Sequence, residues 1–146
     1  MPVIEHKISI NRSVTDVFKF LVDFSNNPKW QPNSIRLERN GHVKLGDMIV
    51  GTRRVLGRQV HVNADVVDYS PNQTIAFTGI MGAYPFRTTY KFYFGGGGTD
   101  FTEIMDVRIP WIYFWARPLL IPGLDGQIRT SLENLKEYLN AHKDRG

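Results

Sequence analysis

Two ionisable residues stand among apolar neighbours in segments that alternate like β-strands. His6 shares its face of residues 3–10 with three isoleucines. Glu103 occupies the apolar face of residues 99–109. Burial raises the pKa of a carboxyl group, and a neighbouring charge tunes a histidine through neutrality, so the two residues are candidates for general acid–base catalysis. The alternative is that either side chain lies at a strand end and reaches solvent.

Other kinds of chemistry lack candidates in this chain. It contains no cysteine, which excludes disulfides, thiolate nucleophiles and metal sites built on thiolates. No Gly-x-Ser-x-Gly elbow occurs, and no two histidines have the spacing of a helical metal pair. The glycines at 95–98 precede a strand pattern rather than a helix, which predicts a hairpin turn and not a phosphate loop. We therefore expect neither a metal nor a cofactor.

One strand face is unusually rich in aromatic side chains. Residues 84–94 alternate aromatic and polar positions, and neighbouring strands continue the apolar face. Such a surface has much apolar area and few hydrogen-bonding groups, as a pocket for a hydrophobic ligand does. The alternative is that these side chains touch one another and fill the core. The ligand-binding residues predicted on these strands are Phe77, Tyr84, Phe86, Tyr90, Phe92, Phe94, Phe101 and Met105.

Polar contacts to such a ligand also have candidates. Tyr84 and Tyr90 can donate a hydrogen bond to a ligand carbonyl. Arg54 or Arg87 can pair with a ligand carboxylate, although Arg87 falls on the outward face of its strand.

The three tryptophans lie outside the strand patterns. Trp30 follows a proline-interrupted helix at 14–24, and it would either line the pocket or plug the core beneath the turn. Segment 111–123 holds more large apolar groups than one helix face requires. We expect it to fold over the pocket as a lid, with an exposed contact to a membrane or a partner as the alternative. The ligand-binding residues predicted in this segment are Trp111, Phe114 and Trp115.

The order of elements predicts an α+β fold. A first strand, two short helices and about six further antiparallel strands precede one long helix, giving a curved sheet of about seven strands. The long helix carries an apolar stripe, and Pro118 and Pro122 should kink its beginning or separate it from the aromatic segment. The stripe consists of Leu124, Ile128, Leu132, Leu135 and Leu139. We expect residues 1–146 to form a single domain.

Composition and charge indicate where the protein acts and which partners it lacks. With 42% hydrophobic and 22% charged residues, the chain is typical of a soluble globular protein. The first ten residues lack a signal-peptide core, so we expect a cytoplasmic location, and the apolar run at 109–124 is too short to span a bilayer. Net charge is +4, but the basic residues are scattered, so we expect no nucleic-acid partner.

In this order of segments the chain resembles the polyketide cyclase/dehydrase-like branch of the START-related helix-grip superfamily, often called SRPBCC. The matching residues are the strand ending at Ile10 and segments 14–24, 28–33, 65–77, 97–103 and 132–139. The resemblance implies a curved sheet that grips the C-terminal helix around a cavity, with Trp30 near a helix pair closing one end. It also implies that the first and last strands are neighbours, so that His6 and Glu103 could meet inside.

Three functions remain open at this point. The first is binding of a hydrophobic or aromatic small molecule (a lipid, polyketide or isoprenoid-like compound) between the sheet and the long helix. The second is a cofactor-independent polyketide cyclase or dehydratase that uses His6 and Glu103. The third is a coenzyme-Q-type lipid adaptor that touches a membrane weakly through segment 111–123, since Arg117 and the positive net charge suit anionic lipid. Either a monomer or a homodimer is compatible with the sequence.

Overall fold

The computed structural model describes residues 3–23, 26, 29–31, 34–37 and 45–141, with only the backbone of 34–37. Its elements follow the chain in an α+β order. They are β1 (Val3–Ile10), α1 (Val14–Val22), β2 (Ser34–Leu37), β3 (Met48–Val55), β4 (Arg58–Ser70), β5 (Thr74–Met81), β6 (Tyr84–Gly95), β7 (Gly98–Val107), the 3-10 helix η2 (Trp111–Ala116) and α2 (Arg117–Ala141).

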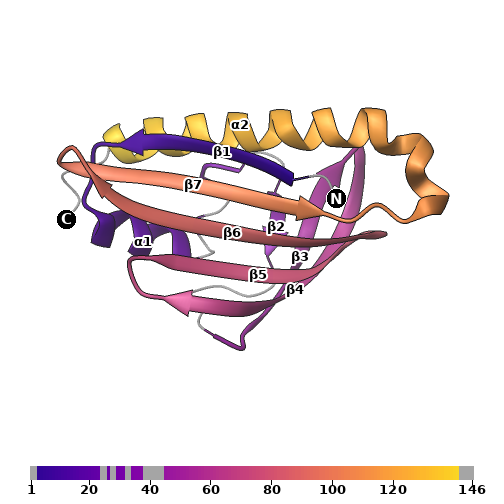
Figure 1. Cartoon of the computed structure of the whole chain (residues 1–146), viewed down its shortest axis with the longest axis horizontal. Helices are drawn as coiled ribbons and strands as arrows, with labels where there is room; N and C mark the ends of the chain where they lie inside the picture. Colours follow the sequence, from indigo (N-terminus) through magenta and orange to yellow (C-terminus); the bar gives the residue numbers. More distant parts are fainter. Residues whose placement is uncertain (1–2, 24–25, 27–28, 32–33, 38–44, 142–146) are drawn as a thin grey trace.

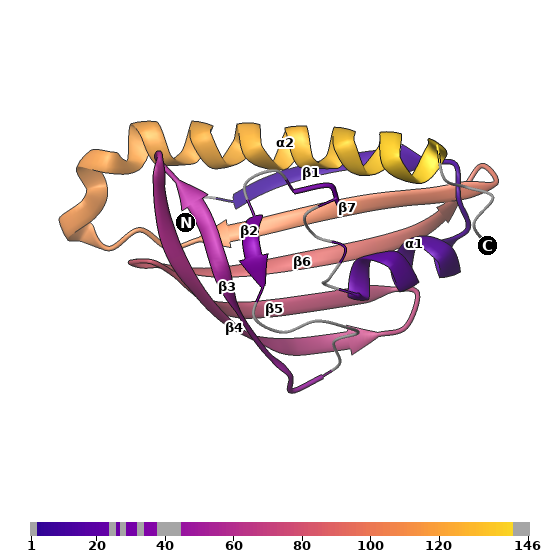
Figure 2. The same cartoon turned by 180° about the vertical axis from the view of Figure 1, so that it is seen from behind.

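One antiparallel sheet, in the order β1-β7-β6-β5-β4-β3-β2, curls around α2 (Figure 1). The helix packs against β1 at one edge and also contacts β3 near the other edge, which requires the sheet to curve (Figure 2). Six strands have eight residues or more, and the edge strand β2 has four. The predicted α+β fold, with a curved antiparallel sheet and a long C-terminal helix, is confirmed.

Between β1 and β2, the described residues contain one α-helix, α1, where two short helices were predicted. The second was expected around residues 28–33, of which 28, 32 and 33 lie outside the described residues. The predicted hairpin at 95–98 joins β6 to β7, with Gly96 and Gly97 at positive φ.

The core is the contact between α2 and the inward face of the sheet. Every position of the predicted stripe on α2 is buried, and Leu120 extends it by one turn. Pro118 lies in the first turn, where a missing backbone N–H costs nothing, and Pro122 lies inside the helix. Tyr113 leaves helical geometry at φ −109° and ψ 15° inside the 3-10 helix η2, and α2 follows directly at Arg117, so neither proline lies between the aromatic segment and the long helix.

Two local features shape the pairing of β4 with β5, a register shift and a close approach of the two strands at a glycine. A register shift between Val66 and Asp68 reverses the alternation of β4, which lets Tyr69 reach the inward-facing ring of Phe18. Gly79 lies so close to β4 that an added Cβ would come within 2.5 Å of the Ala64 Cα. A side chain at this position would force the two strands apart.

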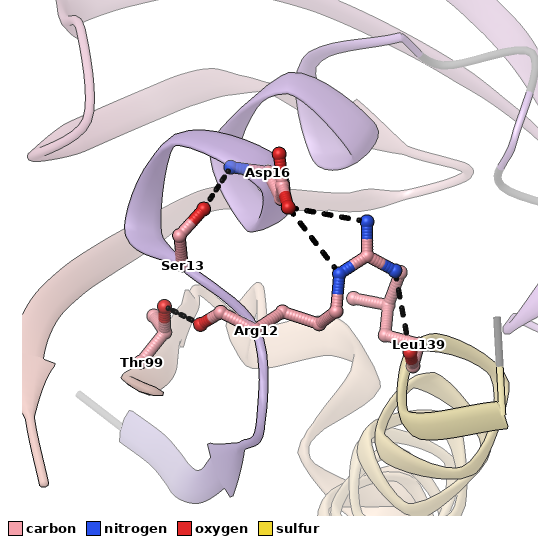
Figure 3. A network of polar contacts seen from close by, with 5 residues as sticks. All are labelled: Arg12, Ser13, Asp16, Thr99 and Leu139. Atoms are coloured by element: carbon pink, nitrogen blue, oxygen red, sulfur yellow. Dashed lines mark hydrogen bonds and ion pairs between the residues drawn. The ribbon is translucent and has the colours of Figure 1, made fainter. Parts of the chain in front are cut away.

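Arg12 joins three parts of the fold at the C-terminal end of α2 (Figure 3). Its Nε and Nη2 both donate to Asp16 Oδ2 at 3.4 Å, and its Nη1 donates to the Leu139 carbonyl at 3.3 Å. Its own carbonyl accepts from Thr99 Oγ1 at 2.8 Å. Ser13 Oγ accepts from the Asp16 N–H at 3.2 Å, which confirms the predicted start of α1. One residue therefore fixes α1 and β7 to α2.

Arg12→Ala should lower the free energy of unfolding by about 1–3 kcal/mol, because it removes charge-assisted hydrogen bonds from a side chain that is only 10% exposed. Urea unfolding measures the change. The matched control is Arg129→Ala, whose side chain is 61% exposed and 3.9 Å from Asp125, and which should change stability by less than ~0.5 kcal/mol. Equal effects of the two substitutions would show that Arg12 does not hold these elements together.

Candidate functional site

Three polar side chains from separate strands gather in the interior of the domain. Tyr90 on β6 and Glu103 on β7 are register partners, and they are 2% and 5% exposed. Arg53 on β3 is half-buried, and the curl of the sheet brings its charge close enough to act on both. Most of the interior is lined by apolar groups, and the other buried polar side chains are threonines and a serine, so these three residues form its polar centre.

Burial dominates the electrostatics of this centre. It raises the pKa of Glu103 to about 7, and the positive charge of Arg53 only partly opposes the rise. Burial, followed by the negative charge of Glu103, raises the pKa of Tyr90 well above its usual range. Within the described part of the chain, no hydrogen bond or ion pair reaches the Glu103 carboxyl group. A buried acid without a partner holds a proton near neutral pH.

Neighbouring amides orient the other members of the centre. Gln31 Nε2 donates to the Tyr90 hydroxyl at 3.4 Å. Arg53 donates through Nε and Nη2 to Gln127 Oε1 on α2, at 3.2 and 3.1 Å. Gln127 Nε2 in turn donates to the Arg54 carbonyl at 2.9 Å. The guanidinium group is therefore held between β3 and α2.

Trp30 adds an unused donor beside Tyr90. Its side chain is 1% exposed, and its ring centroid lies 6.2 Å from that of Tyr90 in an edge-on arrangement. The indole N–H is buried and has no hydrogen-bond partner among the described residues. A buried donor left unsatisfied costs free energy, so this group is available to a ligand acceptor.

The aromatic side chains of the inward face touch one another. The centroid of the Tyr90 ring lies 5.3 Å from that of Phe101 and 5.5 Å from that of Phe77. Phe77 continues to Phe86, and Phe101 continues to Phe92. These contacts are those of a packed core, and the same surface forms an apolar wall next to the polar centre.

The predicted ligand-binding residues divide into two groups. Trp30, Phe86, Tyr90, Phe92, Phe101 and Met105 are buried, and Phe77 and Tyr84 are half-buried. Phe94 is 81% exposed because it lies at the end of β6 beside the glycine hairpin, so inward alternation does not extend to it. The lid expected from segment 111–123 does not cover the interior, since its aromatic side chains other than Tyr113 point outward. Trp111, Phe114 and Trp115 are 83%, 58% and 72% exposed.

His6 and Glu103 lie opposite each other in the register of β1 and β7, but they have different surroundings. His6 Nε2 lies 2.7 Å from Asp125 Oδ1 on α2, in a partly exposed position. Among the described residues, no hydrogen bond joins His6 to Glu103. The structure thus places the two proposed acid–base residues on adjacent strands without pairing their side chains.

Sequence reasoning missed Arg53, Gln31 and Gln127, and it considered Arg54 instead. Arg54 is exposed, and its Nη1 donates to the Gly57 carbonyl. The signal for Arg53 was present in the alternation of β3, where Ile49, Gly51 and Val55 share its parity and are buried. An arginine on such a face points inward.

Two further features are absent from the described ranges. No three His, Asp or Glu side chains gather there as a metal site would require. None of the helices in these ranges combines the length and the apolar character needed to cross a bilayer.

A curved antiparallel sheet that grips a long C-terminal helix defines the helix-grip class of START-related domains. The chain belongs to the family described as polyketide cyclase/dehydrase and lipid transport, whose model matches residues 1–140. The resemblance inferred from the sequence is thereby confirmed. None of the curated proteins searched matches the chain.

Several solved structures are similar to this chain over nearly its whole length. A protein from Thermus thermophilus aligns with a TM-score of 0.81 and 16% identity, over 96% of this chain and 98% of the other. A protein from Mesorhizobium loti aligns with a TM-score of 0.75 and 13% identity, over 96% and 98%. The Aha1 dimer from Colwellia psychrerythraea aligns with a TM-score of 0.67 and 19% identity, over 96% and 97%. At these identities the likeness shows the fold alone.

Glu103→Gln should stabilise the domain at about pH 8 and have little effect at about pH 4. Folding raises the pKa of Glu103 from 4.5 to about 7, so its contribution to stability is intact below pH 4.5 and is lost as the pH rises through 7. Above that pH the loss is ~3 kcal/mol, which the uncharged amide avoids. Melting temperatures of both proteins at the two pH values measure the effect.

The matched control is Glu133→Gln on the exposed side of α2, which should leave the melting temperature unchanged relative to wild type at both pH values. A gain from Glu103→Gln that is equally large at both pH values would show that ionisation of Glu103 does not oppose folding.

Proposed function

We propose that this domain binds a hydrophobic or aromatic small molecule, of lipid, polyketide or isoprenoid type, between the curved sheet and α2. The observation that carries the proposal is the partnerless Glu103 carboxyl group, buried among aromatic rings. A second donor without a partner, the Trp30 indole N–H, lies beside the same tyrosine. Family membership supports the proposal, because the family description includes lipid transport.

The polar centre indicates which end of the ligand would lie there. A protonated Glu103 and the Trp30 indole both donate hydrogen bonds, and Arg53 favours negative charge. A ligand with a carbonyl or carboxylate oxygen at one end and an apolar body would satisfy both halves of the site. Burying ~300 Å² of apolar ligand surface contributes about 7 kcal/mol before association costs, which corresponds to micromolar binding at best unless polar contacts help.

The first test is native mass spectrometry of the protein purified from its own host, with extraction and identification of any bound compound. The second is a thermal-shift panel of hydrophobic compounds that includes oleate as the carboxylate and menadione as the quinone. Binding predicts a co-purified apolar compound or a raised melting temperature. An empty protein that no compound stabilises would mean that the aromatic side chains only fill the core.

Tyr90→Phe should weaken the affinity for menadione by about 5–10-fold, because it removes a hydroxyl group of the polar centre, to which Gln31 donates at 3.4 Å, while the ring packing remains. Tyr93→Phe is the matched control, since Tyr93 lies on the same strand and is 54% exposed. Titration calorimetry compares the two variants with wild type. A loss of affinity in both variants, or in neither, would place the bound compound away from Tyr90.

The second candidate function is a cofactor-independent cyclase or dehydratase. The observation that favours it is the Glu103 pKa of about 7, which lets one group both give and take a proton near neutral pH. We propose Glu103 as the proton-transfer residue. His6 could join it only after releasing Asp125, which it contacts at 2.7 Å.

Glu103→Gln and His6→Ala separate a binder from an enzyme. In a binder both variants keep the affinity for the compound recovered from the host to within a few fold. In an acid–base enzyme Glu103→Gln lowers turnover of that compound by about 10²-fold or more. Product formation by mass spectrometry measures turnover, and a wild-type protein that leaves the compound unchanged would rule out this second function.

A further inference from the structure

The 3-10 helix η2 leads into α2 at one end of the molecule (Figure 1), and large apolar side chains of this segment are exposed there. We call this cluster the aromatic end patch. Scattered apolar residues are normal on a protein surface, but a contiguous group of this size marks a contact site. The patch consists of Trp111 (83% exposed), Ile112 (57%), Phe114 (58%), Trp115 (72%) and Leu119 (64%).

The geometry of η2 accounts for this exposure. Tyr113 turns toward the sheet, where its ring lies 5.9 Å from that of Tyr84, and Ala116 is 1% exposed. These two residues attach the 3-10 helix to the domain. The remaining four residues of η2 therefore point into solvent, including both tryptophans.

The charged residues of the segment that carries the patch are all basic. Residues 107–124 contain no Asp or Glu, while Arg108 and Arg117 lie in this segment and are both exposed. A second copy of the chain, docked patch to patch, would bring the arginines of both copies together without acids from this segment to neutralise them. An anionic lipid surface instead complements these charges.

We propose that the aromatic end patch inserts into the interface of a membrane that contains anionic lipid, and so holds the domain on its surface. Tryptophan favours the headgroup region, where its ring is buried and its N–H stays hydrated. The side chains of Ile112, Phe114 and Leu119 insert among the lipid acyl chains. Arg108 and Arg117 contact the lipid phosphates. The contact is peripheral, since the inserted segment is a short 3-10 helix and the first turn of α2.

The patch also adjoins the inward aromatic face. Tyr84, which Tyr113 touches, lies two residues before Phe86 on the same face of β6. The proposed ligand site thus has one end close to the proposed membrane contact, so a bilayer would be the source or the destination of the ligand. Membrane binding itself does not depend on that ligand, and it is measured without it.

Co-sedimentation with two kinds of vesicle tests the proposal, one of phosphatidylcholine alone and one of phosphatidylcholine mixed with phosphatidylserine. The wild-type protein should bind the mixed vesicles more strongly, with a blue shift of tryptophan emission. The double variant W111A/W115A should bind the mixed vesicles with an affinity at least about tenfold lower than that of the wild type. It retains only the buried Trp30, so its emission also reports whether the fold is intact.

The matched control is F94A, which removes an 81% exposed aromatic side chain from the end of β6. The β6–β7 hairpin that follows lies at the end of the molecule opposite η2 (Figure 2). It should bind the mixed vesicles as the wild type does. R117Q should reduce binding to the mixed vesicles by about fivefold and leave the weak binding to phosphatidylcholine unchanged.

Absence of wild-type binding to the mixed vesicles would overturn the proposal, as would equal binding by W111A/W115A. Sedimentation velocity without lipid tests the alternative that a second copy of the chain binds the patch. A dimer that W111A/W115A converts to a monomer would assign the patch to self-association instead. Each of these results leaves the ligand site untouched, because the thermal-shift panel tests that site separately.

Discussion

The burial of one helix stripe by one sheet face determines the rest of this structure. The inward face of the sheet is apolar along most of its length, and α2 is the element that covers it. A 25-residue helix is ~37 Å long, so a single straight element can cover strands of eight to 13 residues. The sheet must curl to enclose it, and that curl brings β3 toward β7. Arg12 then fixes the far end of α2 through Leu139.

The polar centre depends on the same enclosure. Glu103 and Tyr90 come from the middle of the sheet, where α2 excludes water, and Arg53 reaches them only because the sheet is curved. The low dielectric that follows from good packing raises the pKa of Glu103, so the site is formed at some cost in stability. Such an opposition between fold stability and a buried ionisable group is common at functional sites.

Local periodicity was sufficient to predict the elements but not their curvature. The alternation around His6, the apolar stripe of α2 and the inward position of Glu103 could all be read from neighbouring residues. The contact between Arg53 and Gln127 joins residues 74 positions apart, and that between His6 and Asp125 spans 119. Neither follows from a repeat of two or 3.6 residues. Phe94 shows a second limit, because alternation cannot tell where a strand stops facing the core as it enters a turn.

The pairing of β1 with β7 has a consequence for how the chain reaches this structure. Val3 pairs with Asp106, so β1 leaves the ribosome long before its partner strand has been made. The helix that covers the inner face follows later still. Closing the sheet is therefore a late event of high contact order, and until then the nascent chain holds an unpaired strand and an uncovered apolar face. The topology that encloses the site therefore leaves the nascent chain with surfaces that favour aggregation until synthesis is nearly finished.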